Sequence, residues 1–302
     1  IQEFCRIIEG REALRELYLL TIADISTTSP TAMTSWKARM LDELYFAADA
    51  FLAGGPGATA DDARLRRVRE EAARLWPGDP AFFADFLATM PDRYFLANGK
   101  EAVVAHAKVA AARAGRKVAA ALVPDRHGDV VELCVVAEDR PGLLARIAAA
   151  ITSSKLEVLA AQVYSRSRAG KVEAVDLFWV RDRIDGAAGV ERALPRLLRD
   201  LDDVCSDAVA PDELLRVRTG SASPWAERRS PPVTTEVVID DRASPKHTVI
   251  EVLAKDRPGL LYSLAQALHE LGLPIALSKI NTEGTKVADV FYVTERDGAW
   301  IP

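Results

Sequence analysis

Residues 1–90 carry hydrophobic side chains at the spacing of α-helices. Between Glu12 and Asp24, apolar residues recur at Leu14, Leu17 and Ile22, close to the 3.6-residue helical period. Breaks rich in Ser, Pro or Gly separate this stretch from three more with helical patterning, at 36–47, 60–76 and 81–90. Because no stretch here shows a strand pattern, we expect residues 1–90 to form an all-α region.

Beyond residue 130 the pattern becomes that of a mixed sheet. Val130–Ala137 is compact and β-branched, which is typical of a strand buried on both faces. The elements expected after it are a helix, two strands of a hairpin, a second helix and a last strand, at 143–154, 156–167, 171–180, 188–204 and 234–239. This βαββαβ order predicts a ferredoxin-like unit over 130–241, preceded by a connecting segment over 91–129.

A six-residue sequence occurs twice in this part of the chain. Asp139–Leu144 reads Asp-Arg-Pro-Gly-Leu-Leu and recurs 117 positions later as Asp256–Leu261, and residues 175–180 resemble 288–293. A period this long indicates two whole domains rather than a solenoid. We therefore expect a second ferredoxin-like unit over 247–302. It stops before its second helix and fourth strand, so we expect it to be truncated, and the expected fold class is α+β.

Composition and charge narrow the class of protein. The 302 residues include 39 Lys and Arg against 44 Asp and Glu, a net charge of −5, which argues against a nucleic-acid binder because such a protein needs a basic face. Charges interrupt every apolar stretch, so we expect no membrane span, and no signal segment opens the chain. The three cysteines, Cys5, Cys134 and Cys205, are scattered, which argues against a disulfide framework and favours the cytoplasm.

Isolated reactive side chains do not point to catalysis. His106 lies in an Ala-rich helical stretch, where we expect a packing or solvated residue. Cys134 lies in the middle of a predicted strand and is expected in the core. Cys205 has no basic neighbour in sequence that would activate its thiol, so we do not expect a nucleophile there.

The repeated sequence has the residue types of a strand-to-helix turn that can accept an anion. In the first copy, Pro141 suits the first helical position, Asp139 can cap the helix start, and Gly142 lets a backbone or ligand come close. Free N–H groups at a helix start attract a carboxylate. A capped turn with nothing bound explains one copy equally well, but two copies in the same fold favour a site for an amino acid or another small anion.

A bound amino acid also needs acceptors for its ammonium and side-chain amide, and we expect these on the next strand. The candidate ligand-binding residues of the first unit are Asp139, Arg140, Pro141, Gly142, Leu143, Gln162, Tyr164 and Ser165. Those of the second unit are Asp256, Arg257, Pro258, Gly259, Leu260, Lys279, Asn281 and Thr282. Asp176 and Asp289 recur at matching positions. Each is expected either to accept from a ligand ammonium group or to pair with a nearby Lys or Arg. The polar strand residues differ, so the two sites need not bind equally, and simple alternation in a half-exposed strand explains these residues equally well.

These features resemble the ACT domain, a small regulatory module that commonly binds amino acids. The preceding helical sequence narrows the resemblance, because Leu19–Ile25, Thr34–Ala38 and Leu41–Tyr45 are similar to the end of the HD domain of the bifunctional PII uridylyltransferase/uridylyl-removing enzymes. In that family a nucleotidyltransferase domain attaches UMP to the PII signalling protein, the HD domain removes it, and paired ACT domains sense glutamine. The resemblance implies that residues 1–90 are the C-terminal part of an HD domain, and that the chain is the glutamine-sensing part of such an enzyme. It also implies that PII is the partner and that UTP or UMP binds only to other domains.

The chain lacks the motifs that the catalytic centres of this family require. An HD centre needs a His, an adjacent His-Asp pair and a distant Asp, which together hold Mg or Mn and lower the pKa of the attacking water. None of the four histidines is followed by Asp, and only Asp24 matches a ligand position, that of the last Asp. We therefore expect a metal in the intact enzyme but none bound by this chain, which has no catalytic residues and is expected to be inactive alone.

Two other functions fit parts of the sequence. A non-enzymatic amino-acid-binding ACT-repeat protein, with a regulatory or dimerising role, needs no catalytic domain, and ACT sheets often join edge to edge. A stringent-response enzyme also combines HD and ACT domains, but the helix at 34–37 and the doubled ACT unit argue against it. The sequence upstream of Ile1 would discriminate between the first two functions.

Overall fold

The structure, a computed structural model, divides into two compact units. Residues Ile1–Leu87 and Asp92–Val104 form the helical unit, and Ala88–Pro91 with Ala105–Pro302 form the sheet unit. The residues described are 2–28, 41–42, 44–46, 48–49, 51–52, 58–123, 129–168, 170–219, 233–241, 244, 247–283 and 286–294. No helix among these residues is long and apolar enough to span a membrane.

The helical unit has the all-α character that the hydrophobic pattern predicts. Its described helices are α1 (Gln2–Ile7), α2 (Arg11–Thr28), α4 (Ala58–Leu75), α5 (Pro80–Thr89), α6 (Asp92–Ala97) and α7 (Lys100–Arg113). Helices α5 and α7 continue into the sheet unit. The helix expected over 36–47 lies largely outside the described residues. Helices α6 and α7 fall within 91–129, so this segment has more structure than the connection we expected.

The turn between α4 and α5 shows how local sequence ends and restarts a helix. Trp76 stacks on Phe83 with ring centroids 4.6 Å apart. The carboxylate of Asp79 caps α5 by accepting a hydrogen bond from the N–H of Ala81 at 3.0 Å. Pro80 takes the first helical position, where its missing N–H costs nothing. The cap and the aromatic contact therefore both stabilise the connection between α4 and α5.

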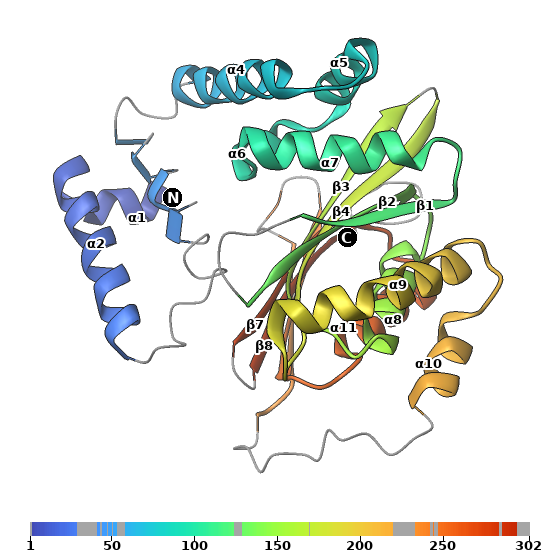
Figure 1. The fold of residues 1–302 in the computed structure, drawn as a ribbon. Coiled ribbons are helices and arrows are strands. Elements are labelled where there is room, and N and C mark those ends of the chain that lie inside the picture. Colours follow the sequence, from blue (N-terminus) through green and yellow to red (C-terminus); the bar gives the residue numbers. More distant parts are fainter. Residues whose placement is uncertain are drawn as a thin grey trace. The chain divides into compact units, whose positions relative to one another are not determined.

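The described part of the sheet unit is built on an antiparallel sheet of eight strands, drawn as arrows in Figure 1. The strands are β1 (Val118–Val123), β2 (Val131–Glu138), β3 (Glu157–Arg168), β4 (Lys171–Arg181), β5 (Glu236–Asp240), β6 (Thr248–Lys255), β7 (Ile275–Glu283) and β8 (Lys286–Val293). Their order across the sheet is β1-β2-β4-β3-β7-β8-β6-β5. Each repeat therefore supplies four neighbouring strands, and the repeats meet where β3 pairs with β7. The α+β class is confirmed.

The order of strands along the chain differs from the predicted βαββαβ order. We assigned the strand at 234–239 to the first repeat, but β5 pairs with β6 at the outer edge of the second repeat. The corresponding place beside β2 is taken by β1, which comes before it in the chain. The first repeat is therefore ββαββα, and the proposed boundaries at residues 130 and 247 both fall between paired strands.

Two physical reasons account for this difference. The sequence of β1, Val-Ala-Ala-Ala-Leu-Val, is rich in Ala, which has a weak preference for strands. The pattern in this segment therefore did not predict a strand. The connection from β5 to β6 is short, and antiparallel strands joined by a short connection usually pair with each other.

Helices α8 (Leu143–Ser153), α9 (Gly186–Cys205) and α11 (Leu260–Glu270) pack on one face of the sheet (Figure 1). The shared core includes Leu133 and Phe178 from the first repeat, Phe291 from the second, and Ile147 of α8, all fully buried. Helices α8 and α11 contact each other, and α10 (Pro211–Thr219) contacts α8. The core is therefore continuous across the two repeats.

Polar side chains of α7 pack against the opposite face of the first repeat. His106 pairs with Glu132 of β2. Arg113 donates to one oxygen of Glu173 on β4 at 2.7 Å, and Arg166 donates to the other oxygen at 2.7 Å. Strand β2 is consequently buried on both faces, as its sequence predicts. His106 is fully buried and paired rather than solvated.

Candidate functional site

The repeated Asp-Arg-Pro-Gly sequence forms the same turn in both repeats. The N–H of Leu143 donates to the carbonyl of Arg140 at 3.1 Å, and Gly142 has φ 80° and ψ 6°. These are the angles of the third residue of a type II turn. Gly adopts these angles without strain, and Pro is favoured at the position before it. The second repeat has an equal 3.1 Å bond and φ 76°, ψ 11° at Gly259.

This geometry corrects two expectations about the turn. Helices α8 and α11 begin at Leu143 and Leu260, so Pro141 and Pro258 lie in the turn rather than at the first helical position. The glycine is the N-cap in both repeats, and neither helix start has a side-chain capping hydrogen bond. The turn places each Asp three residues before the N-cap, which leaves its carboxylate available for other partners.

Each turn lies against the end of the helix from the other repeat. A Cβ at Gly142 would lie 3.1 Å from the ring of His269 near the end of α11, and a Cβ at Gly259 would lie 3.5 Å from Thr152 near the end of α8. His269 and Thr152 are 117 positions apart, like the two glycines. The contact between α8 and α11 therefore has pseudo-two-fold symmetry.

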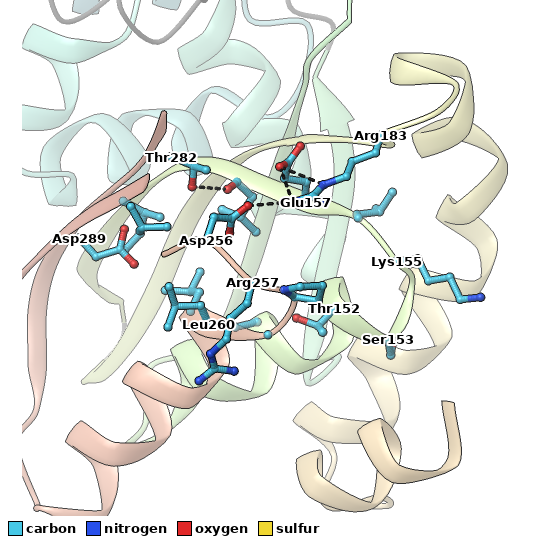
Figure 2. A pocket seen from close by; sticks show the side chains of 18 residues that line it. Thr152, Ser153, Lys155, Glu157, Arg183, Asp256, Arg257, Leu260, Thr282 and Asp289 are labelled. Carbon is cyan, nitrogen blue, oxygen red and sulfur yellow. Dashed lines mark hydrogen bonds and ion pairs between the residues drawn. The ribbon is translucent and has the colours of Figure 1, made fainter. Parts of the chain in front are cut away.

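A cavity lies at each of these contacts. We call them the first-turn cavity, of about 670 Å³ at 139–145, and the second-turn cavity, of about 110 Å³ at 256–261. The first-turn cavity is lined by Asp139, Arg140, Pro141, Gly142, Leu143, Leu144, Ala145, Val163, Ser165, Val172, Ala174, Asp176, Ala265, His269, Gly272, Leu273, Pro274, Ile275 and Ala276. The second-turn cavity (Figure 2) is lined by Ala148, Thr152, Ser153, Lys155, Leu156, Glu157, Val158, Arg183, Asp256, Arg257, Pro258, Gly259, Leu260, Leu261, Ile280, Thr282, Val287 and Asp289.

Most of the residues predicted for ligand binding line these cavities. In the first-turn cavity they are Asp139, Arg140, Pro141, Gly142, Leu143 and Ser165. In the second-turn cavity they are Asp256, Arg257, Pro258, Gly259, Leu260 and Thr282. The structure thus brings each turn and one polar strand residue to the same cavity, which is the juxtaposition that the sequence analysis required.

The remaining predicted strand residues do not line the cavities. Gln162 and Tyr164 are buried on the opposite face of the sheet, where the Tyr164 hydroxyl donates to Gln162 at 2.7 Å. Lys279 pairs with Gln162 across β3 and β7 and also lies outside both cavities. The side chain of Asn281 lies outside the described residues. Gln162 and Tyr164 each lie one position from Val163, which faces the helices. Because alternate residues of a strand face opposite sides, these two side chains point away from the cavity.

More than a third of the residues that line each cavity come from the other repeat, and none of these was among the predicted ligand-binding residues. Thr152, Glu157 and Arg183 of the first repeat line the second-turn cavity, and His269 and Leu273 of the second repeat line the first-turn cavity. The 117-residue spacing revealed the duplication. It contained no information that β3 would pair with β7 and bring each turn against the other repeat.

Charged residues at the second-turn cavity connect the two repeats (Figure 2). Arg183 donates to Glu157 at 3.0 and 3.2 Å and to Asp256 of the second repeat at 2.8 Å. Arg181 donates to the other oxygen of Glu157 at 2.6 Å. Burial, and then the nearby Glu157 carboxylate, raise the pKa of Asp256, although the Arg183 guanidinium opposes this shift.

The polar residues of the first-turn cavity make contacts within their own repeat. Ser165 donates to Asp139 at 2.6 Å. Arg140 donates to Asp207 at 2.6 Å, beyond the end of α9. Deep in the two cavities, the buried Asp176 and Asp289 occupy equivalent positions. A carboxylate at this place is a suitable acceptor for a ligand ammonium group.

Asp24, the predicted metal ligand, lies on an exposed part of α2. Its carbonyl accepts a hydrogen bond from the Thr27 hydroxyl at 3.0 Å. Within the described ranges, no group of three or more His, Cys, Asp or Glu could hold a metal ion.

Comparisons with known proteins agree with this architecture. Residues 236–301 match a family model described as an ACR9-like, ACT-like domain, and this match starts where β5 starts. Relatives named bifunctional uridylyltransferase/uridylyl-removing enzyme match the whole chain. The Caulobacter vibrioides protein is 36% identical over 306 residues, which cover 100% of this chain and 32% of that protein. The Phenylobacterium zucineum protein is 34% identical over 311 residues, which cover 99% and 31%.

A third relative with the same name, from Rhodospirillum rubrum, is 32% identical over 306 residues, which cover 100% of this chain and 32% of that protein. The chain therefore spans about a third of the length of the curated relatives that it matches. Over essentially its whole length, the chain is similar to about a third of the length of each of these bifunctional uridylyltransferase/uridylyl-removing enzymes. This similarity confirms the resemblance found in its sequence.

Proposed function

We propose that this chain is the glutamine-sensing regulatory part of a bifunctional enzyme that uridylylates and deuridylylates the PII protein. The observation that carries the proposal is the pair of symmetry-related cavities between the repeats. Each cavity combines the same turn with a buried carboxylate, Asp176 or Asp289. The name of the relatives supports the two enzymatic activities, and the resemblance found in the sequence supports glutamine as effector and PII as partner.

The chemistry of each cavity suits an α-amino acid. A zwitterion needs donors for its carboxylate and an acceptor for its ammonium group. The first N–H of α8 and of α11 is bonded within the turn, but the second and third N–H groups, which have no partner within their own helix, can donate to the carboxylate. The buried Asp176 or Asp289 can accept from the ammonium group. Since both repeats line each cavity, an amino acid bound there contacts both at once.

Binding at a repeat interface regulates an enzyme only if the affinity differs between two arrangements of the protein. In this proposal, glutamine favours one arrangement of the ACT pair and so biases which catalytic activity of the parent enzyme is available. UTP and UMP bind to other domains of that enzyme. Asp24 supplies at most the last ligand of a Mg or Mn site whose other ligands come from elsewhere, and we expect this chain alone to be inactive.

Isothermal titration calorimetry with L-glutamine tests this proposal directly. We expect the chain to bind L-glutamine, and to bind L-glutamate more weakly because its second carboxylate would lie near buried aspartates. The substitutions Asp289→Asn and Asp176→Asn each remove one ammonium acceptor and should weaken binding at one cavity. Glu236→Gln, which changes an exposed carboxylate on β5, is the matched control. Failure of the unmodified chain to bind millimolar L-glutamine would contradict the proposed function.

A second candidate is a non-enzymatic ACT-repeat protein that self-associates. Strand β5 favours it, because it lies at the edge of the sheet among the described residues, Val237 and Ile239 are 59% and 68% exposed there, and an edge strand can pair with another strand. Analytical ultracentrifugation without ligand discriminates the two functions. Concentration-dependent association that Ile239→Lys abolishes, together with no response to amino acids, would favour this candidate.

A further inference from the structure

The two cavities differ in how their equivalent polar residues are bonded. At the first turn, Ser165 donates to Asp139 at 2.6 Å, so these two side chains bond within one repeat. Their equivalents in the second repeat are Thr282 and Asp256. Thr282 instead donates to the carbonyl of Val158 in the first repeat at 3.2 Å. Asp256 accepts from Arg183, also in the first repeat, at 2.8 Å.

Arg183 is held at this place by a tight turn after β4. The carboxylate of Asp182 accepts from the N–H groups of Ile184 and Asp185 at 2.8 and 2.9 Å. The N–H of Gly186 donates to the Asp182 carbonyl at 3.0 Å. Glu157 then holds the Arg183 guanidinium over the cavity at 3.0 Å. The direction of Arg183 toward Asp256 is therefore set by local hydrogen bonds.

Among the residues that the structure describes, the lining of the first-turn cavity forms no such bridge. The position equivalent to Glu157 is Pro274, which has no carboxylate to orient a guanidinium. Arg140, which belongs to the first turn, is bonded to Asp207 at 2.6 Å and to the carbonyl of Cys205 at 2.8 Å. Among the described residues, the ion pair between repeats is thus a property of the second-turn cavity.

The second-turn cavity is smaller than the first-turn cavity, and a guanidinium lies on one of its carboxylates. Its volume is about 110 Å³, and the Arg183 guanidinium lies on Asp256, one of the carboxylates that line it. A ligand ammonium group has three N–H donors, so beside its bond to Asp289 it would compete with this guanidinium for Asp256. The side chain of Arg183 is 39% exposed, so it can move toward solvent without rearrangement of the core.

We propose that Arg183 is a displaceable latch between the repeats, and that an amino acid entering the second-turn cavity replaces its guanidinium on Asp256 with the ligand ammonium group. This inference rests on the proposed function. Binding at the second turn then opens a contact between the repeats. Binding at the first turn leaves that contact closed. The second-turn cavity is therefore the one through which an amino acid alters how the repeats are held together.

Calorimetric titration of the full chain with L-glutamine at about pH 8, where carboxylates are ionised, tests the latch. Arg183→Met removes the competing cation, and the dissociation constant for glutamine should fall about fivefold, the change expected for loss of a partly exposed ion pair. Arg183→Lys keeps a cation and should bind nearly as the unmodified chain does. N-acetyl-L-glutamine, which lacks the ammonium group, should gain nothing from Arg183→Met.

Arg181→Met is the matched control, because Arg181 also bonds Glu157 and is 40% exposed but is not bonded to Asp256. It should leave the dissociation constant unchanged. An unchanged or larger dissociation constant in Arg183→Met, with glutamine still bound by the unmodified chain, would overturn the latch and leave the proposed function intact. No binding by either protein would contradict the proposed function itself. Should the methionine variant fail to fold, Arg183→Gln provides the same comparison.

Discussion

The Cα of Gly142 faces the imidazole ring of His269, so closely that a Cβ on the glycine would lie 3.1 Å from the ring. The glycine belongs to the turn of the first repeat and the histidine to the helix of the second. The equivalent contact, between Gly259 and Thr152, leaves 3.5 Å for the same added atom. The close approach of the two repeats therefore depends on glycine in the turns, and more strictly at the first turn than at the second.

Gly142→Ala should destabilise the protein for two separable reasons. The residue has φ 80°, and a non-glycine residue in this region costs about 1–3 kcal/mol. The added Cβ must also displace His269. Gly170→Ala is the matched control, because Gly170 has φ 77° but no neighbouring atom within 4 Å of the added Cβ. Urea unfolding should show a larger loss for Gly142→Ala, and His269→Ala should recover the excess. Equal losses at both glycines would contradict a tight contact with His269.

Removal of one partner of the buried His106–Glu132 pair should be strongly destabilising. His106 is fully buried and Glu132 nearly so, and leaving a buried hydrogen-bonding group without its partner costs about 1–3 kcal/mol. We expect His106→Leu to lower the free energy of unfolding by this amount. The double substitution with Glu132→Leu should recover much of it, because no buried charge is left unpaired. A double-mutant cycle measured by denaturant unfolding gives the coupling energy between the two residues. A coupling energy of zero would contradict the pairing.

Asp207 should contribute to the acid sensitivity of the protein. Hydrogen bonding to Arg140 and the nearby charge of Arg146 lower its pKa. A carboxylate whose pKa is lower in the folded state stabilises the fold above its unfolded pKa of about 4, and this contribution disappears as the pH falls through the folded value. Asp207→Asn should therefore reduce stability at neutral pH and flatten the loss of stability below about pH 4. Thermal melts of the unmodified chain and of Asp207→Asn at a series of pH values measure this difference. A parallel loss of stability in both proteins on acidification would contradict the prediction.

The cysteines should be unreactive while the protein is folded. All three are free and buried. Burial raises the pKa of Cys205 to about 11 and also raises the pKa of Cys134, so little thiolate is present at neutral pH. We expect a chromogenic disulfide reagent at about pH 8 to label the native chain slowly and the urea-unfolded chain fully. Rapid labelling of one thiol in the native chain would contradict this.

The sequence predicted the features that depend on neighbouring residues. Periodicity distinguished the helices of residues 1–90 from the strands beyond 130, and the recurrence of Asp139–Leu144 at 256–261 revealed the duplication. A turn requires Pro and Gly at defined positions, so its sequence alone also indicates a candidate ligand site. Of the strand residues chosen in the first repeat, Ser165 lines the cavity, whereas Gln162 and Tyr164 do not.

Tertiary structure decided the features that depend on residues far apart in the chain. The Ala-rich β1 becomes a strand because β2 offers it a partner, and β5 belongs to the second repeat because it pairs with β6. The contact of Arg183 with Asp256 exists only because β3 pairs with β7. Local sequence determines backbone preference, whereas packing and strand pairing select which distant surfaces meet. The turns could therefore be recognised in the sequence, but the cavities that join the two repeats could not.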